Sequence, residues 1–265
     1  MNSVAEARVS ALFDLTGKAA VVTGSSRGLG FEIARAFAEA GARVMISSED
    51  AAACAMAQQS LADLGVAVSW RKCDVTTADD QSSLIEAVID EFGGLDILVA
   101  NAGISGPMSG TADIDRQVYS KVMAVNLDSV VRLCDLALPH MRARGGGSII
   151  LMASLAALRG NRSLGVYALS KAALAQLARN LAVQQGAENI RANAIAPGFI
   201  RTDLAAPLLA DAAFMARRMQ NTPLRRPGEP FEVAGAAVFL ASAAGGFVTG
   251  QTLVVDGGTL ITDGS

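Results

Sequence analysis

The chain has 265 residues, of which 51% are hydrophobic and 18% are charged, a composition typical of a globular protein with a packed core. Lys and Arg number 22 against 25 for Asp and Glu, and this formal charge of −3 argues against a nucleic-acid partner. Every apolar run is broken before about 18 residues, which argues against a membrane span. The three cysteines lack metal-ligand spacing, so they predict buried thiols in a reducing cytoplasm.

The first segment, residues 1–15, carries charged side chains and no long apolar run. It predicts a short N-terminal arm rather than a secretory signal or a membrane anchor. No linker, low-complexity run or internal repeat divides the remainder. We therefore expect residues 16–265 to form a single domain.

Short β-branched runs then alternate with segments of helical periodicity. An apolar strand at 18–23 ends in glycine, and a helix follows at 29–40. Further strands are expected at 43–47, 67–73, 97–100, 147–154, 190–196 and 252–255, and further helices at 51–64, 81–92, 170–185 and 232–240. This alternation predicts an α/β class: a doubly wound Rossmann-type fold whose central parallel sheet carries helices on both faces.

The alternation is interrupted between residues 200 and 230. Residues 204–219 favour a helix, and prolines follow at 223, 227 and 230, which predicts a helical flap with stiff hinges over a site. Its apolar side chains favour an apolar ketone or secondary alcohol as substrate. Arg159, Arg162 and Arg201 leave open a substrate that carries a carboxylate or phosphate.

A glycine-rich turn, Thr23-Gly24-Ser25-Ser26-Arg27-Gly28-Leu29-Gly30, joins the first strand to its helix. Backbone N–H groups at a helix N-terminus attract anions, and glycine lets a pyrophosphate approach the backbone closely. A glycine triplet alone is equally compatible with a tight turn that packs helix on strand. Its position at the first βα turn of a doubly wound sheet favours dinucleotide binding.

The Gly-x-x-x-Gly-x-Gly spacing of this turn is one of several motifs through which the chain resembles the short-chain dehydrogenase/reductase family. The others are Cys73-Asp74-Val75, Asn101-Ala102-Gly103, Asn126, Ser154, Tyr167-x-x-x-Lys171, Pro197-Gly198 and Val255-Asp256-Gly257-Gly258. Each motif alone is weak, but the ordered set is specific and spans nearly the whole chain. The resemblance implies an NAD(P)-dependent oxidoreductase acting on CH–OH and C=O groups. Ala100 departs from the family, which often has a second asparagine there.

The resemblance also implies where the cofactor lies. Asp74 and Val75 would flank the adenine, Asn101 to Gly103 would line its ribose, and Ile200 and Thr202 would hold the nicotinamide carboxamide. The implied cofactor site comprises Gly24, Ser26, Arg27, Gly28, Leu29, Gly30, Glu49, Asp74, Val75, Asn101, Ala102, Gly103, Tyr167, Lys171, Pro197, Gly198, Ile200 and Thr202.

The choice between NAD and NADP depends on the end of the second strand, about 20 residues beyond the glycines. A carboxylate at Glu49 would hydrogen-bond the ribose 2′-OH and repel a 2′-phosphate. Arg27 argues the other way, because NADP-using relatives employ an arginine in the glycine loop to bind that phosphate. We expect NAD(H) to be slightly favoured over NADP(H).

Tyr167 and Lys171 are four residues apart, so on a helix both side chains project from one face. The ammonium and a positive nicotinamide ring would both favour the phenolate and lower the tyrosine pKa from its usual value of about 10. Tyr167 is therefore the expected general acid/base, with Lys171 also binding the nicotinamide ribose. Ser154 would hold the substrate oxygen, and Asn126, by the family resemblance, would complete a proton path through water and Lys171.

Other functions remain to be weighed against this one. Taken singly, a Tyr-x-x-x-Lys pair, a serine after a strand or an asparagine has a structural explanation, and only the combination favours catalysis. His140 is the only histidine, so neither a Ser-His-Asp triad nor a histidine zinc site can form, and we expect no metal. The alternative is a catalytically silent dinucleotide-binding regulator or scaffold, although such proteins usually lose one of the catalytic residues. Relatives are commonly tetramers, and the side chains on the helix after Tyr167 that would suit a homotetramer contact are Ala172, Ala173, Leu174, Leu177 and Leu181.

Overall fold

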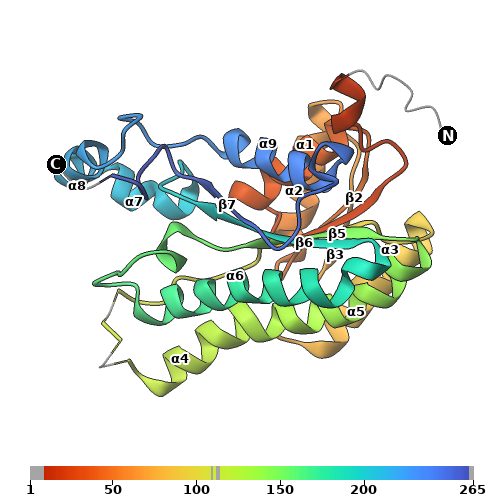
Figure 1. Cartoon of the computed structure of the whole chain (residues 1–265), viewed down its shortest axis with the longest axis horizontal. Coiled ribbons are helices and arrows are strands. Elements are labelled where there is room, and N and C mark those ends of the chain that lie inside the picture. The colour runs from red at the N-terminus through yellow and green to blue at the C-terminus, as the bar shows by residue number, and fades with distance from the viewer. Residues whose placement is uncertain (1–8, 109, 112–113, 263–265) are drawn as a thin grey trace.

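A seven-stranded parallel sheet in the order β3-β2-β1-β4-β5-β6-β7 forms the centre of the protein (Figure 1). The computed structural model describes residues 9–262 except 109, 112 and 113. The strands are β1 (Ala19–Thr23), β2 (Arg43–Ser48), β3 (Ser69–Lys72), β4 (Ile97–Ala100), β5 (Gly147–Met152), β6 (Ile190–Pro197) and β7 (Thr252–Val255). The chain winds outward in both directions from β1 and β4, so the topological switch point, where such sheets bind ligands, lies between these two strands.

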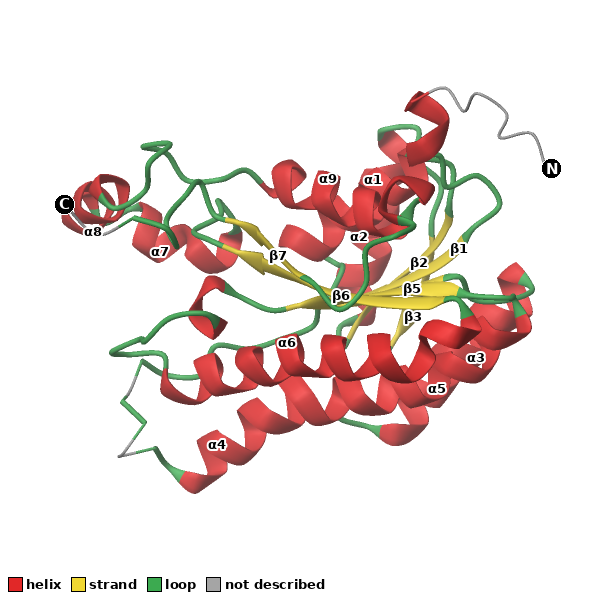
Figure 2. Ribbon diagram, viewed as in Figure 1, coloured by secondary structure: helices red, strands yellow, loops and turns green. Residues whose placement is uncertain are grey.

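Helices cover both faces of the sheet (Figure 2). One face carries α1 (Gly28–Glu39), α2 (Ala51–Asp63) and α9 (Pro230–Ala241). The other carries α3 (Ala78–Phe92), α4 (Arg116–Met123), α5 (Ser129–Ala143) and α6 (Gly165–Gln185). The predicted doubly wound α/β fold is confirmed.

The central strands are buried on both faces, which explains their continuous apolar character. Along β1, Ala19 and Val21 face one core while Ala20 and Val22 face the other, as the two-residue period of a strand requires. All four side chains are fully buried. The edge strand β3 differs, because its last two residues are exposed.

The expected elements agree with the structure to within a few residues, apart from three differences near the site. The helix expected from residue 170 begins at Gly165, which places Tyr167 inside its first turn. The strand expected to reach residue 154 ends at Met152, so Ser154 lies in the loop that follows. A long helical region was not assigned: α4 and α5 are joined by a π-helical turn, Ala124–Asp128.

The N-terminal segment is described only in part. Residues 1–8 of the expected arm lie outside the described residues, and Val9–Phe13 form a short 3₁₀ helix. Leu15 is buried, and its N–H donates to the carbonyl of Ala40.

No helix in the described part of the chain combines the length and the apolar character needed to cross a membrane.

Residues 200–230 form two short helices, α7 (Ala206–Leu209) and α8 (Ala212–Gln220), where the sequence predicted one. They lie at one end of the molecule, near the residues that follow β7 (Figure 1). The side chain of Asp211 caps α8 by accepting from the N–H of Phe214, which explains the break between the helices. The two ends of this flap meet at a bridge between Ile200 and Gly228.

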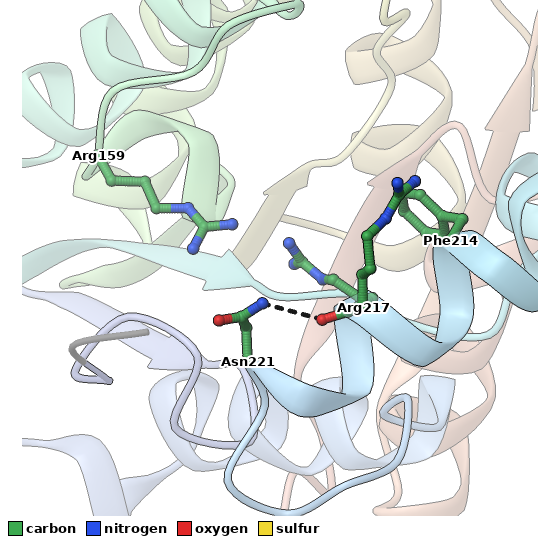
Figure 3. Close-up of a pocket in the computed structure, with 5 residues that line it drawn as sticks. Arg159, Phe214, Arg217 and Asn221 are labelled. Carbon is green, nitrogen blue, oxygen red and sulfur yellow. Dashed lines mark hydrogen bonds between the residues drawn. The ribbon is translucent and has the colours of Figure 1, made fainter. Parts of the chain in front are cut away.

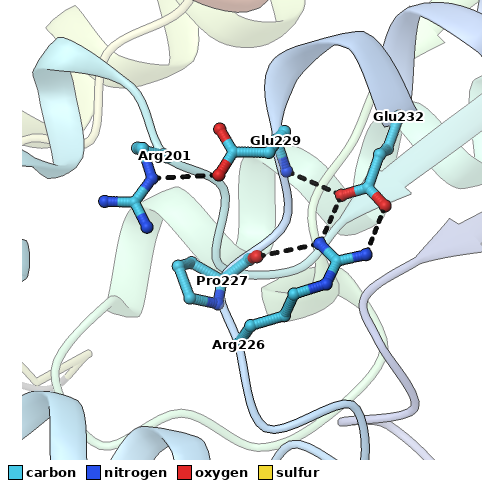
Figure 4. A network of polar contacts seen from close by, with 5 residues as sticks. All are labelled: Arg201, Arg226, Pro227, Glu229 and Glu232. Carbon is cyan, nitrogen blue, oxygen red and sulfur yellow. Dashed lines mark hydrogen bonds and ion pairs between the residues drawn. The ribbon is translucent and has the colours of Figure 1, made fainter.

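The neck of the flap, residues 199–201 and 226–232, is tied by two ion pairs (Figure 4). Arg201 contacts Glu229 at 3.0 Å, and Arg226 makes a two-pronged contact with Glu232 at 2.6 and 2.7 Å. Glu232 also accepts from the N–H of Glu229 at the start of α9. The hydrogen bond with Arg226 is the main cause that lowers the pKa of Glu232 to about 2.

Replacing Glu232 by Gln is expected to destabilise the protein by about 1 kcal/mol at pH 7, because the neck loses an exposed ion pair. The folded-state pKa is below its ordinary value of 4.5, so the carboxylate stabilises the fold above pH 4.5. That contribution disappears as the pH falls from 4.5 to 2. Denaturant unfolding of both proteins across this range measures the effect. A difference that does not shrink on acidification would contradict the lowered pKa.

Candidate active site

The glycine turn after β1 brings the N-terminus of α1 close to the end of β4. Gly24 has a φ of +62°, and a Cβ there would lie 2.8 Å from the Cα of Ala102. A Cβ on Gly30 would collide with the carbonyl oxygen of Gly24. The amide of Asn101 donates to the carbonyls of Thr23 and Gly24 at 3.0 and 2.8 Å. Backbone therefore approaches backbone here, and only glycine permits it.

The first turn of α1 fits the pyrophosphate of a dinucleotide. Arg27 occupies the N-cap position, and no side chain caps the helix, so its first N–H groups remain available to an anion. Gly28 has a φ of +61°, and a Cβ there would meet no atom within 4 Å among the described residues. Ser26 and Leu29 are half-buried beside it. The turn is thus both open and rich in backbone donors.

The residues expected around the adenosine lie at the ends of β2 and β3. Glu49 is exposed directly after β2, and its carboxylate accepts from the hydroxyl of Ser48 at 3.1 Å. Arg27 is exposed at the start of α1. Hydrogen bonds from Thr76 lower the pKa of Asp74, and Val75 is buried in the core. The side chains of Glu49 and Arg27 are therefore both accessible to a ribose or a phosphate that binds from solvent.

Thr23 joins strands β1 and β4 at the switch point. Its hydroxyl accepts from the N–H groups of Asn101 and Ala102 at 3.1 and 3.2 Å. These contacts fix the segment of Asn101, Ala102 and Gly103 that follows β4. The sequence placed these three residues in the cofactor site but did not identify Thr23 as their anchor.

Tyr167 and Ser154 meet where the first turn of α6 faces the loop after β5. Burial raises the pKa of Tyr167, and a hydrogen bond with Ser154 acts more weakly in the opposite direction. The hydroxyl of Ser154 also accepts from the N–H of Ala156 at 3.1 Å, which caps the following 3₁₀ turn.

The raised pKa of Tyr167 differs from the lowering expected from the sequence. Desolvation disfavours a phenolate, and Lys171 does not figure among the causes of the shift.

Lys171 lies one turn further along α6, on the same side as Tyr167. Its Nζ is 5.7 Å from the centre of the Tyr167 ring and donates to the carbonyl of Met152 at 2.7 Å. The residue is only 4% exposed, and burial lowers the pKa of its ammonium to about 8. One of the three ammonium protons is thus held by the main chain, which leaves two for other partners.

Asn126 sits in the π-helical turn between α4 and α5 and is fully buried. Its side chain both accepts from the N–H and donates to the carbonyl of Ile104, at 2.8 and 2.9 Å. It also donates to the hydroxyl of Ser170 at 3.0 Å, which in turn donates to the carbonyl of Tyr167. A single π turn within a long helix is frequent at functional sites.

Gly103 lies next to the side chains of both Asn126 and Lys171. A Cβ on Gly103 would lie 3.2 Å from Nζ of Lys171 and 3.3 Å from Oδ1 of Asn126. The exposed Gly103 therefore lies beside the buried side chains of both Asn126 and Lys171.

The loop after β6 carries the residues expected at the nicotinamide. Pro197 ends β6, and Gly198 donates its N–H to the carbonyl of Val255 at 2.9 Å. A Cβ on Gly198 would lie 2.7 Å from the Cα of Asp256, so the loop is packed tightly against the segment after β7. Ile200 is buried, and Thr202 is half-buried just before the flap.

Several residues near this site were not found from the sequence. Ser170 links Asn126 to the backbone of Tyr167, and the carbonyl of Met152 holds Lys171. Ser170 is three residues after Tyr167 on a helix, which was an available signal. The carbonyl of Met152 and the π-helical turn leave no signal in the sequence.

The three arginines considered for an anionic substrate have different surroundings. Arg201 pairs with Glu229 in the flap neck, and Arg162 is exposed. Arg159 lines a pocket of about 300 Å³ beside α8 (Figure 3). Within the described residues, no group of three or more His, Cys, Asp and Glu side chains is arranged to hold a metal ion.

Comparison with known proteins places this geometry among known enzymes. Residues 24–259 match the family model described as Enoyl-(Acyl carrier protein) reductase. The chain is 38% identical over 244 residues to Dehydrogenase/reductase SDR family member 4 of Oryctolagus cuniculus, which covers 92% of this chain and 94% of that protein. It is 39% identical to the 7alpha-hydroxysteroid dehydrogenase of Escherichia coli K12, with the same two coverages.

Solved structures agree over almost the whole chain. A 7alpha-hydroxysteroid dehydrogenase complexed with NADH and 7-oxo glycochenodeoxycholic acid superposes with a TM-score of 0.90 at 39% identity, covering 95% of this chain and 98% of that one. A gluconate 5-dehydrogenase from Burkholderia cenocepacia J2315, in complex with NADP and tartrate, superposes with a TM-score of 0.91 at 36% identity, covering 96% and 100%. The chain belongs to the short-chain dehydrogenase/reductase family and is an NAD(P)-dependent oxidoreductase of CH–OH and C=O groups.

Proposed function

We propose that the protein interconverts a secondary alcohol and a ketone, with Tyr167 as the general acid/base. The observation that supports this most directly is the grouping of Ser154, Tyr167 and Lys171 at the start of α6, with Asn126 joined to it through Ser170. Nothing in the comparisons favours the catalytically silent alternative, because the relatives named above are dehydrogenases or reductases.

The dinucleotide would be held by the glycine turn and by the loops after β2, β3, β4 and β6. The open N-terminus of α1 would bind the pyrophosphate, while Ile200 and Thr202 would hold the carboxamide. When bound, the nicotinamide supplies the carbon that accepts or donates a hydride. Two free donors on Lys171 are available for the nicotinamide ribose.

The proton is handled by the protein side chains. In oxidation, Tyr167 accepts the hydroxyl proton of the alcohol, while the hydroxyl of Ser154 holds the same oxygen in place. In reduction, Tyr167 donates that proton to the carbonyl oxygen. Lys171 stabilises the phenolate, and Asn126, beside Gly103, connects Lys171 to the path by which a proton returns from solvent.

We expect a preference for NAD over NADP. Variants of Glu49 and Arg27 should shift this preference in opposite directions. Replacing Glu49 by Gln should raise kcat/KM for NADP⁺ by about tenfold, because the exposed carboxylate no longer repels a 2′-phosphate. Replacing Arg27 by Gln should lower kcat/KM for NADP⁺ and leave NAD⁺ little changed. Initial rates with both cofactors measure the ratio. A preference of the natural protein for NADP⁺ above tenfold would contradict the proposal.

The substrate is proposed to be a small molecule with an apolar body. Phe214 and Met215 are half-buried on α8, the flap helix that would cover the substrate. The relatives include a hydroxysteroid dehydrogenase and a gluconate 5-dehydrogenase, so the family accommodates both apolar and polar substrates.

We further propose that the protein is a cytoplasmic homotetramer. Leu169 and Val183 are 49% and 86% exposed on α6, and Val131 is 39% exposed on the neighbouring α5, as a contact face between subunits would require. Size-exclusion chromatography with light scattering tests the assembly.

The proposed reaction is tested by incubating the protein with NAD⁺ or NADP⁺ and a panel of secondary alcohols, and with the reduced cofactors and ketones. Formation or loss of reduced nicotinamide absorbance is the expected result. Binding of a dinucleotide without turnover on any member of a broad panel would instead support the silent alternative.

A further inference from the structure

The pocket beside α8 has an unusual charge. It is lined by Arg159, Phe214, Arg217, Arg218 and Asn221 (Figure 3). Three of these five side chains are guanidinium groups, and none is acidic. Among residues 9–262, with 109, 112 and 113 left out, no hydrogen bond or ion pair joins any of the three guanidinium groups to another side chain. Asn221 donates its amide to the carbonyl of Arg217 and so is held at the end of α8.

The positive charge is poorly compensated by the described residues around it. Nε of Arg218 is buried without a hydrogen-bond partner, and its guanidinium lies 5.7 Å from the centre of the Phe199 ring. Burial lowers the pKa of Arg218, and the like charge of Arg159 lowers it further. The negative charge of Asp256 acts in the opposite direction, but it is the smallest of the three causes, and no ion pair joins its carboxylate to Arg218 among the described residues. A buried, unpaired donor of this kind favours an anionic ligand.

The pocket adjoins the proposed reaction site on two sides. Arg159 is five residues after Ser154 on the same loop, so their Cα atoms are at most about 17 Å apart. On the other side, the ring of Phe214 lies 5.5 Å from that of Phe199, which stands between Gly198 and Ile200. The pocket is therefore linked to the loop of Ser154 through Arg159, and to the loop after β6 through Phe214 and Phe199.

The wall that carries Arg217 and Arg218 is anchored to the body of the protein. Just after α8, the hydroxyls of Thr222 and Thr259 are 3.0 Å apart, and the N–H of Leu224 donates to the carbonyl of Gly257 at 3.1 Å. The arginines thus project from a fixed helix end. Figure 3 shows Arg159 reaching from its loop toward this end of α8.

We propose that this pocket binds an anionic oxygen group, a carboxylate or a phosphate monoester, at the end of the substrate remote from the reacting carbon. Guanidinium groups pair with either anion through two parallel hydrogen bonds, and Phe214 offers an apolar wall for the chain between the two ends. This inference rests on the proposed function and defines its substrate class: a ketone or secondary alcohol with a distant negative charge.

The test compares substrates that share a methyl ketone on a similar unbranched chain and differ in the group at the far end. 6-Oxoheptanoate, its methyl ester and 6-oxoheptyl phosphate are reduced with NADH or NADPH. We expect kcat/KM for one or both anions to exceed that for the ester by about 10- to 100-fold. The anion with the larger ratio identifies the group that the pocket accepts. Equal rates for all three compounds would overturn the inference and leave the proposed function intact.

Variants show whether the arginines cause the discrimination. The double variant Arg159→Gln, Arg218→Gln removes the two guanidinium groups whose charges act on each other and should bring the anion-to-ester ratio of kcat/KM close to one. The matched control is the pair Arg71→Gln and Arg116→Gln, because it removes the same number of charges from exposed positions on β3 and α4. An unchanged ratio in the double variant, or the same loss in the control, would overturn the inference.

Binding provides a readout that does not depend on turnover. Calorimetric titration of the protein, with oxidised cofactor present, should show tighter binding of 6-oxoheptanoate or 6-oxoheptyl phosphate than of the ester, and the double variant should lose this difference. Arginine-dependent binding without any reduction would mean that the proposed function fails while the anion site stands. Reduction without arginine-dependent binding would mean that the proposed function stands while the anion site fails.

Discussion

Replacing Tyr167 by Phe is expected to lower kcat by between about 100- and 10,000-fold, the usual contribution of a positioned general acid or base. The change removes the hydroxyl and keeps the half-buried ring beside Lys171. Cofactor binding should therefore be nearly intact, and fluorescence or calorimetric titration can check it alongside the steady-state rates. Activity above a few per cent of that of the natural protein would refute the role of Tyr167.

The chain offers a matched control for this experiment. Tyr119 is the only other tyrosine, and it lies half-buried on α4. Tyr119→Phe removes the same hydroxyl from a position without a proposed role, so it should leave kcat within about twofold of the natural value. A large loss in both variants would point to a general structural effect instead of proton transfer.

The fold could be predicted well because its signals are local. Parallel strands buried on both faces must be apolar along their whole length, as Val21 and Val22 are, and glycine marks the ends of several of them. The turn from Gly24 to Gly30 was equally accessible, because close backbone contacts restrict the sequence directly. The family resemblance then placed Ser154, Tyr167 and Lys171 in order along the chain.

The parts that could not be predicted depend on contacts between distant segments. A π-helical turn differs from an α-helical one by a single residue of hydrogen-bond register, so nothing in the sequence around Asn126 announces it. Lys171 is held by a carbonyl of β5, which has no side-chain signature. The pocket joins Arg159 to a helix of the flap, and the sequence alone did not show that Arg217 and Arg218 would face it.

Tertiary burial also explains why the pKa of Tyr167 is raised in the protein alone, whereas a lowering is expected with a bound nicotinamide. Spacing on a helix predicts that Lys171 and Tyr167 share a face, and the structure agrees. It does not predict how much water each group loses. Burial disfavours the charged form of both, so it raises the pKa of the phenol and lowers that of the ammonium. The two shifts move the two pKa values apart, to about 8 for Lys171 and above the ordinary value of 10.0 for Tyr167, so burial favours the neutral form of both groups.

Replacing Lys171 by Met is expected to lower kcat/KM about 100-fold or more, because Tyr167 loses its cation and the ribose loses a donor. Methionine keeps an unbranched apolar chain in the buried position, so the variant should fold. Lys121→Met, at an exposed position on α4, is the matched control and should change little. A variant that keeps most of its activity would remove Lys171 from the proposed mechanism.

Lys171→Met also has an expected effect on stability that a loss of activity alone would not reveal. The ammonium titrates at about 8 in the folded protein against an ordinary value of 10.5. Between these two pH values the unfolded chain holds a proton that the folded chain has released, so unfolding takes up a proton. The free energy of unfolding of the natural protein should therefore rise relative to that of the variant, by at most about 3 kcal/mol between pH 7 and 10.5. Denaturant unfolding at a series of pH values measures this difference, and a constant difference would show that the folded protein holds Lys171 at its ordinary pKa.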